Sequence, residues 1–385
     1  MDLLFTEEQK MLRDMTRRLC EDVVPLPVLR TLEGHAPGYS TACWQSMGEV
    51  GLSGLSIAEP YGGLGLGATE LMIAHEEFGR GLVLSPHFVS SVLAASLLEV
   101  AGSQEQQRRW LPDIASGTGI VTVASLEADS GDSLTGIQCR ASRVGGRLQL
   151  NGTKYLVPYA ATATALLVLA RTGEAPDAVI ACLVDRTSPG LSMEYQANLA
   201  GEALYRVELS DVALDDERVL KGGESIVADW QTAMYRSLIA LAAQAVGGAA
   251  RVHDMTVEYA KVREAFGKQI GAFQAIAHYL ADVAVELEGC RTLLQQAAWA
   301  LDQGYPFRRL AAMAKLQCCE MYRRAAAVAI QVHGGMGYTI DADPQLFYRR
   351  AKQLQAMHWS AEFLEERIAA LYLQEVPDTG WTARV

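Results

Sequence analysis

The order of two hydrophobic repeats along the chain limits the possible folds more than any other feature. From Thr6 to about Gly117, apolar residues recur at helical spacing, broken by the runs EPYGGLGLG and VAGSQEQQRRWLPD. From GIVTVASLE onward, short alternating or β-branched runs are separated by Gly, Asn and Asp, which is typical of strands and turns. After KGGES the helical spacing returns and continues to near the end. The sequence therefore predicts helices, then a sheet, then a helical bundle.

We expect an α+β protein that is mainly α, with an N-terminal helical domain at 1–117, a central antiparallel β domain at 118–222 and a C-terminal helical bundle at 223–385. Within the sheet, the pair Asn151-Gly152 predicts a hairpin turn. The bundle begins with long helices, one of which keeps an apolar face at Phe273, Ile276, Leu280, Val283 and Leu287, and continues with helices at about 307–332, 344–357 and 360–375.

Composition and charge exclude several classes of protein. The formal net charge of -12 and the absence of Lys/Arg runs argue against a nucleic-acid partner, because tracking phosphates requires a basic face. The seven cysteines show no CxxC spacing, which indicates reduced, buried thiols and no metal site. The start resembles an amphipathic helix and no apolar run is long enough for a membrane span. We therefore expect a soluble, cytoplasmic protein that does not bind membranes.

The run GLGLGA, from Gly63 to Ala68, formally fits a dinucleotide-binding pattern. Such a fingerprint must follow a buried strand in a βαβ unit, whereas this run follows Pro60-Tyr61 between two predicted helices. We interpret it as a glycine-rich turn, and we predict no nicotinamide site.

Two later corners are more informative. REAFGKQIGAFQ, at 263–274, ends one helix with an arginine and starts the next, and QVHGGMGYT, at 331–339, ends another helix with a Gly-Gly pair. Arginine offers forked donors to phosphate oxygens, and glycine lets a ligand approach the backbone amides. Taken singly, each corner is more typical of a glycine-capped helix end with an ordinary surface arginine. Together, on this helix–sheet–helix plan, they favour a pyrophosphate clamp.

At this point the sequence resembles the acyl-CoA dehydrogenase family over nearly its whole length. The blocks PYGGLGLGATELMIAHEEFGR, GSQEQQRRWLPDIASG, LNGTKY, REAFGKQIGAFQ and QVHGGMGYTIDADPQLFYRRAK occur in the family's order and spacing. The resemblance implies a C-terminal four-helix bundle, FAD held between subunits of a tetramer, an acyl-CoA substrate and an electron-transfer flavoprotein as acceptor. It also implies that one group of residues contacts the ADP part of the FAD bound mainly by a neighbouring subunit: Arg263, Phe266, Gln274, Gln331, Gly334 and Gly335.

Two segments depart from the family pattern near the flavin ring. The usual TEPxAGSD loop is replaced by LEADSGDS, in which only Glu127 and Gly131 match. The strand that usually reads WIT has Leu156, Val157 and Pro158 instead. Because proline has no amide hydrogen and favours sheet edges, we expect flavin contacts to be lost at this strand.

A third departure concerns the catalytic base. Alignment on Arg349 and Lys352 places His358 where the family has its glutamate, followed by Trp359 and by Ser360, which we count among the cofactor-binding residues. The alternative base position of some members falls at Ser237. A neutral imidazole could accept a proton, but a buried histidine without a catalytic role is the alternative, and Trp359 would fill the space meant for the thioester.

Three interpretations follow. The preferred one resembles the base-lacking subunit of heteromeric α2β2 steroid-degrading acyl-CoA dehydrogenases: this chain contributes the ADP clamp, and a homologous partner subunit supplies the glutamate. The second is a self-sufficient homotetrameric flavoenzyme of altered chemistry with His358 at the base position. The third is a non-catalytic scaffold or acyl-CoA-binding protein.

Overall fold

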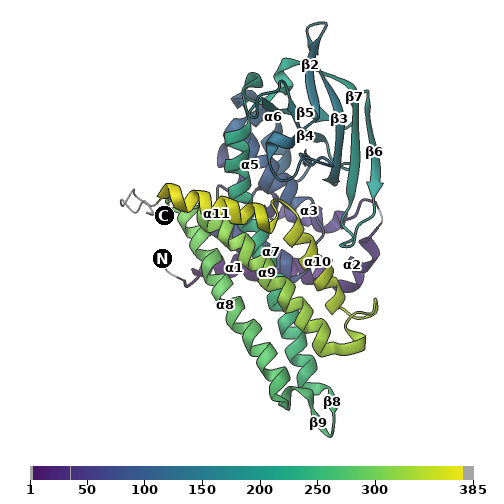
Figure 1. Cartoon of the computed structure of the whole chain (residues 1–385), viewed down its shortest axis with the longest axis vertical. Helices are drawn as coiled ribbons and strands as arrows, with labels where there is room; N and C mark the ends of the chain where they lie inside the picture. The colour runs from purple at the N-terminus through teal and green to yellow at the C-terminus, as the bar shows by residue number, and fades with distance from the viewer. Residues whose placement is uncertain (1–2, 35, 376–385) are drawn as a thin grey trace, which may run out of the picture.

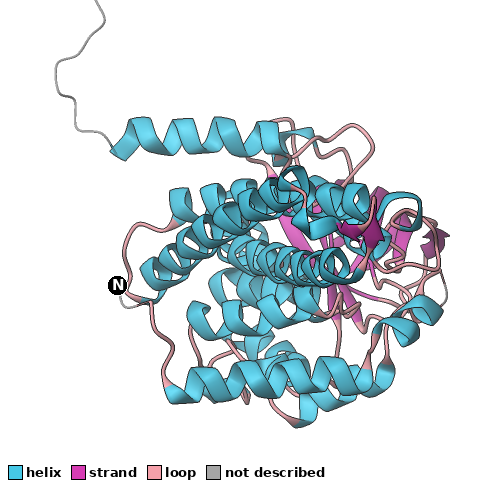
Figure 2. Cartoon of the chain, turned by 90° about the horizontal axis from the view of Figure 1, so that it is seen from below, coloured by secondary structure: helices cyan, strands magenta, loops and turns pink. Residues whose placement is uncertain are grey.

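A computed structural model describes residues 3–34 and 36–375. The chain runs through helices, a sheet and a long helical bundle in that order, and the predicted fold class is confirmed (Figure 1). The boundaries expected after residues 117 and 222 stay predictions, and the last ten residues of the predicted C-terminal domain, 376–385, lie outside the described residues. Seen from below, the bundle helices lie in front of the strands (Figure 2).

The N-terminal part is helical because its apolar residues share faces and its helix ends are capped. Thr6 and Gln9 form a reciprocal capping box at the start of the first helix, and Ser103 and Gln106 form another. A π-helical segment, Phe88–Ala94, leads directly into α5. The α-helices are α1 (Glu7–Val23), α2 (Leu26–Leu32), α3 (Thr41–Glu49), α4 (Ala68–Arg80), α5 (Ala95–Ala101) and α6 (Gln104–Ala115). The glycines of GLGLGA lie in the loop before α4, after a short 3-10 turn and no strand, as expected for a turn.

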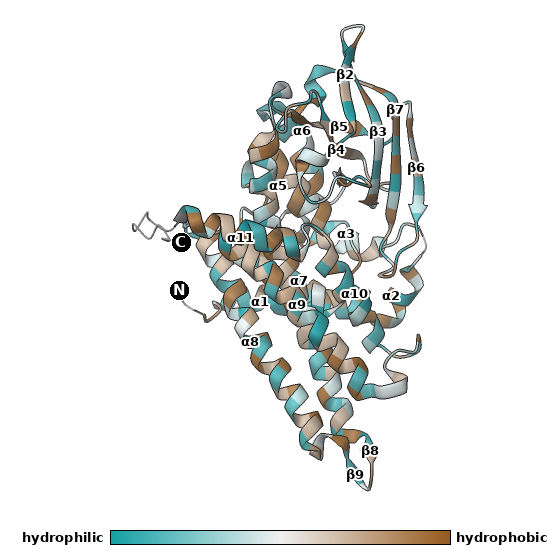
Figure 3. Ribbon diagram, viewed as in Figure 1, coloured by the Kyte–Doolittle hydropathy of each residue, from teal (hydrophilic) through white to brown (hydrophobic). Residues whose placement is uncertain are grey.

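The central sheet is antiparallel except around β4. Its order is β1-β4-β2-β3-β7-β6, with β5 also paired to β4, and β1 lies parallel to β4. The edge strand β6 alternates half-buried and exposed residues and is largely hydrophilic (Figure 3), which protects a free edge. The strands are β1 (Val121–Ala124), β2 (Arg140–Val144), β3 (Arg147–Pro158), β4 (Ala165–Arg171), β5 (Val179–Asp185), β6 (Leu191–Gln196) and β7 (Leu204–Leu214).

The hairpin predicted at Asn151-Gly152 is wrong. Both residues lie inside β3, at a register shift against β7, and the β2–β3 turn is made instead by Gly145 and Gly146. Asn151 exchanges two hydrogen bonds with Asp211 across the bulge. A Cβ on Gly152 would lie 2.7 Å from the Cα of Cys139, so glycine is needed here for close strand approach and not for a turn.

The bundle packs closely against the N-terminal helices. The long helix α7 (Val227–Val262) crosses α4 at glycines: a Cβ on Gly247 would lie 1.7 Å from the carbonyl oxygen of Glu76, and one on Gly79 would lie 2.0 Å from that of Gln244. The other elements are the short strands β8 (Glu264–Ala265) and β9 (Lys268–Gln269), then α8 (Gln274–Asp302), α9 (Arg308–His333), α10 (Pro344–Ala356) and α11 (Ala361–Glu375).

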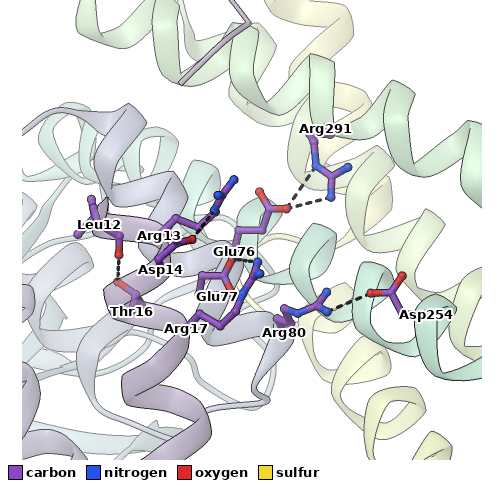
Figure 4. A network of polar contacts seen from close by, with 10 residues as sticks. All are labelled: Leu12, Arg13, Asp14, Thr16, Arg17, Glu76, Glu77, Arg80, Asp254 and Arg291. Carbon is purple, nitrogen blue, oxygen red and sulfur yellow. Dashed lines mark hydrogen bonds and ion pairs between the residues drawn. The ribbon is translucent and has the colours of Figure 1, made fainter. Parts of the chain in front are cut away.

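A polar network fastens α1, α4 and the bundle together (Figure 4). The buried carboxylate of Glu77 accepts two hydrogen bonds from Arg17, at 2.8 and 2.7 Å. The neighbouring Glu76 pairs with Arg291 of α8, at 3.0 Å between the closest atoms. Because a two-pronged arginine–carboxylate pair fixes orientation as well as distance, this network sets the angle at which the bundle meets the N-terminal helices.

Three expectations from the sequence concern the cysteines, the apolar face of α8 and the absence of a membrane span. All seven cysteines lie within the described residues, and each is buried and free. Of the predicted apolar face of α8, Val283 and Leu287 are buried, whereas the residues nearer its start are only half covered. Among the described helices, none combines the length and apolarity required to span a membrane.

Candidate functional site

A cavity of about 340 Å³ lies between the sheet and the bundle. Its walls come from the loop 125–134, the end of β3, the start of α7 and the turn between α10 and α11. The three segments that depart from the family pattern, represented by Leu126, Pro158 and His358, therefore meet at one site.

The loop after β1 is anchored by a buried carboxylate. Glu127 accepts hydrogen bonds from the amides of Gln138 and Cys139, at 2.6 and 3.0 Å, and from Nζ of Lys154 at 2.5 Å. Lys154 is fully buried. The retained Glu127 thus acts on loop structure, while its neighbours Leu126 and Gly131 line the cavity. No sequence signal indicated Lys154, because it stands in an alternating strand pattern where a surface lysine is usual.

The strand segment Leu156–Pro158 presents no amide donor at its last residue. Pro158 lines the cavity and pairs with Leu204 of β7, and its carbonyl oxygen accepts the hydroxyl of Thr122. β3 as a whole lies between β2 and β7, but β2 pairs only with residues 147–151, so at Pro158 the strand is paired on the β7 side alone, as expected for a proline. Proline is tolerated because it is the terminal residue of the strand. Leu156, at a φ of 51°, lies at a bulge and also lines the cavity.

The turn that carries the base position is held from two sides. His358 and Trp359 both have left-handed backbone, with φ of 51° and 73°. Nζ of Lys315, in α9, donates to the carbonyl oxygens of Trp359 at 2.7 Å and Gln355 at 3.1 Å. On the other side, the amide of residue 360 donates to a carboxylate oxygen of Asp132 at 2.9 Å. Because left-handed conformations are unfavourable for non-glycine residues, these contacts are what keep the turn in place.

The imidazole of His358 is a weak base in this position. Burial, and then the ammonium of Lys315, lower its pKa to about 4, although Asp132 acts in the opposite direction. Its Nε2 is buried and has no hydrogen-bond partner among the described residues, and its ring packs on Phe88 at 5.0 Å between centroids. The ring is therefore neutral at pH 7. A base of such low pKa has little driving force to remove a proton from a carbon acid.

Trp359 is packed into the protein. It is 4% exposed and meets Tyr235 edge to face, with 5.0 Å between ring centroids. The alternative base position, Ser237, is fully buried and donates its hydroxyl to the carbonyl of Ala233. Ser360 caps α11, its hydroxyl accepting from the amide of Phe363 at 3.3 Å. None of these side chains replaces the missing carboxylate.

The predicted clamp residues gather at the far end of the bundle from the sheet, around the β8–β9 hairpin (Figure 1). Tyr259 of α7 stacks on His333 of α9, with 4.2 Å between ring centroids, and this contact brings the two corners together. In the described part of the chain, the exposed side chains of Arg263, Gln274 and Gln331 make no hydrogen bond or ion pair.

This end of the bundle around the β8–β9 hairpin, which we call the tip, also leaves its backbone accessible to a ligand. Phe266 is 96% exposed, and a Cβ on Gly334 or Gly335 would meet nothing within 4 Å. The six clamp residues are thus together and free to bind, but they lie at the opposite end of the bundle from the turn between α10 and α11, which carries His358 and Ser360 (Figure 1).

Comparison with known proteins agrees with this arrangement. Residues 227–373 match the acyl-CoA dehydrogenase C-terminal domain, and residues 6–118 match its N-terminal domain. A probable acyl-CoA dehydrogenase of Bacillus subtilis, YngJ, is 31% identical over 383 residues, covering 97% of this chain and 100% of that protein. A chain of the ChsE4-ChsE5 complex from Mycobacterium tuberculosis is 28% identical, with a TM-score of 0.87, covering 98% of this chain and 100% of its own. A chain of the Tcur3481-Tcur3483 steroid ACAD is 30% identical, with a TM-score of 0.85, covering 96% and 98%.

The chain belongs to the acyl-CoA dehydrogenase family. Its cofactor is FAD, and its class of activity is that of an oxidoreductase. The tip fits the ADP part of FAD, because it offers an unpaired guanidinium, two free amides and glycines without Cβ obstruction. At the large cavity, the missing amide of Pro158 removes one possible donor to the flavin ring.

Proposed function

We propose that this chain is one subunit of a heteromeric FAD-dependent acyl-CoA dehydrogenase. It contributes the ADP clamp to FAD shared with a homologous partner, and the partner supplies the glutamate that removes the α-proton of the acyl-CoA thioester. The observation that carries this proposal is the contrast between two sites on the same chain. The clamp residues are exposed and unpartnered, whereas the base position holds a neutral histidine of low pKa beside a packed tryptophan.

The clamp has a clear division of roles. Arg263 would give forked, charge-assisted hydrogen bonds to the pyrophosphate, and Gln274 and Gln331 would give neutral donors. Gly334 and Gly335 would let the pyrophosphate approach the backbone. Bound FAD accepts the β-hydride of the substrate. Ser360, whose hydroxyl can still donate while it caps α11, would also bind the cofactor.

The substrate that we propose is a steroid side-chain CoA ester. Support comes from the likeness to a solved protein described as a steroid ACAD and to the two-component ChsE4-ChsE5 complex. We further propose a heterotetramer, an electron-transfer flavoprotein as acceptor and a cytoplasmic location, as the family resemblance suggested.

Two alternatives have specific support. A self-sufficient homotetramer is favoured by the location of His358, which lines the cavity at the family's base position. A non-catalytic acyl-CoA-binding protein is favoured by the absence of a carboxylate at that position and at Ser237.

Expression of the chain alone, and together with the product of the neighbouring gene, distinguishes these three functions. The proposal predicts that stoichiometric FAD and acyl-CoA oxidation occur only on co-expression. A yellow, active homotetramer from the isolated chain would contradict it, and a colourless co-expressed complex would indicate the non-catalytic protein.

The clamp itself is tested by Arg263→Ala in the co-expressed complex. We expect loss of one charge-assisted pair to weaken FAD binding by about ten-fold or more. The matched control is Arg140→Ala, which removes another exposed arginine, at the sheet and paired with Glu174. Equal FAD affinity in both variants would contradict the clamp.

A further inference from the structure

A second, smaller cavity of about 30 Å³ lies where the N-terminal helices, the sheet and the bundle meet. It shares Gln353 and Met357 with the large cavity, so these two side chains form a common wall. We call this space the junction chamber. The polar residues that line it come from all three parts of the chain: His75, Ser85, His87, Tyr159, Glu202, Gln244, Arg350 and Gln353.

The hydrogen bonds of the two histidines fix where their protons are. Nδ1 of His75 lies 2.9 Å from the amide nitrogen of Gln244, which donates, so the proton of His75 is on Nε2. Nε2 of His87 lies 2.9 Å from the carbonyl oxygen of Leu52, which can only accept, so the proton of His87 is on Nε2 and its Nδ1 is an acceptor. Each ring is therefore left with one unused nitrogen, a donor on His75 and an acceptor on His87.

These unused atoms are buried at the chamber. Among the described residues, Nε2 of His75, Nδ1 of His87 and Oε1 of Gln353 have no hydrogen-bond partner, and Oη of Tyr159 has none of good geometry, although the carboxylate of Glu202 is close to it. The two histidines and Tyr159 are at most 1% exposed. The histidine rings are 5.0 Å apart between centroids, yet the donor of one does not bond the acceptor of the other. Buried polar groups of this kind are normally satisfied by a partner.

We propose that the junction chamber binds one or two water molecules, which accept a hydrogen bond from His75 and donate to His87 and Gln353. The size of the chamber selects this ligand, because one water needs roughly 10–15 Å³ of such space. Its chemistry does so too, since the chamber offers a donor, two acceptors and a hydroxyl that can act as either. The amide of Gln353 already donates to Glu202, and the water would hold its oxygen as well, which fixes this part of the wall of the large cavity.

The sign of a stability change tests the proposal. Tyr159→Phe removes only the hydroxyl: it should lower the melting temperature of the protein by ~1–3 °C if water bonds that hydroxyl, and the same loss in a Glu202→Ala background would show that it does not come from the nearby carboxylate of Glu202. Tyr322→Phe is the matched control, because the Tyr322 hydroxyl is also buried without a partner but lines none of the cavities described above. That control should leave the melting temperature unchanged or raised. A melting temperature of Tyr159→Phe that is unchanged or raised would overturn the proposal.

A crystal structure of the protein gives an independent measurement. We expect electron density within hydrogen-bond distance of Nε2 of His75 and Nδ1 of His87. Its absence, at a resolution that shows ordered waters on the surface, would overturn the proposal whatever the variants do.

Discussion

Acid should destabilise this protein through buried neutral histidines, and His87 allows the size of the effect to be calculated. Burial lowers the pKa of His87 from 6.5 to about 4, against the smaller effect of the hydrogen bond to Leu52. Between pH 6.5 and 4, the His87 side chain is therefore mostly protonated in the unfolded chain and mostly neutral in the folded chain. This contribution to stability is fully present above pH 6.5, decreases as the pH falls below 6.5, and is fully lost below pH 4. The loss from His87 alone is about 2 kcal/mol at pH 5 and about 3 kcal/mol below pH 4.

The perturbation is His87→Gln, whose amide can still donate to Leu52 but does not titrate. We expect the free energy of unfolding, measured by urea denaturation at pH 8 and pH 5, to fall less in the variant than in the wild type, by about 2 kcal/mol. His278→Gln, on the exposed side of α8, is the control and should follow the wild type. Parallel pH dependence of wild type and His87→Gln would refute the reasoning.

Three further predictions concern the ion pair, the helix contact and the base position. Lys154→Met leaves Glu127 buried without its cation and should cost about 3–5 kcal/mol in urea unfolding, and adding Glu127→Gln should restore part of this stability. Gly247→Ala should reduce the yield of folded protein, because its Cβ would overlap the backbone of α4, whereas Gly289→Ala, with open space around it, should stabilise by up to about 1 kcal/mol. His358→Ala should change kcat of the co-expressed complex less than two-fold. A loss of orders of magnitude with folding intact would assign the base to this chain.

The order of helices and strands could be predicted because apolar residues repeat at a different spacing on the buried face of a helix than on that of a strand. The same reasoning failed at Asn151-Gly152, because an Asn-Gly pair can form a bulge as well as a turn. Here the close approach of Cys139 to Gly152, which the sequence does not reveal, shows that the pair lies in a bulge.

The location of the candidate site could be predicted from the sequence, but the buried side chains that hold it in place could not. The clamp and the position of His358 followed from local motifs and the family resemblance. Lys315 was missed because a buried lysine in an amphipathic helix looks like a surface residue until the carbonyl oxygens it bonds are known. The pair His75 and His87 was missed because its meaning depends on a contact between a helix and a loop that no spacing encodes.

The bare tip of the bundle has a consequence for the cell. A copy of this chain without its partner exposes nearly the whole ring of Phe266 to solvent. Under the heteromeric function, such a copy resembles an orphan subunit that chaperones and proteases recognise through exposed apolar groups. Balanced synthesis of both subunits would then determine how much of this protein accumulates, and surplus chains would turn over faster than assembled ones.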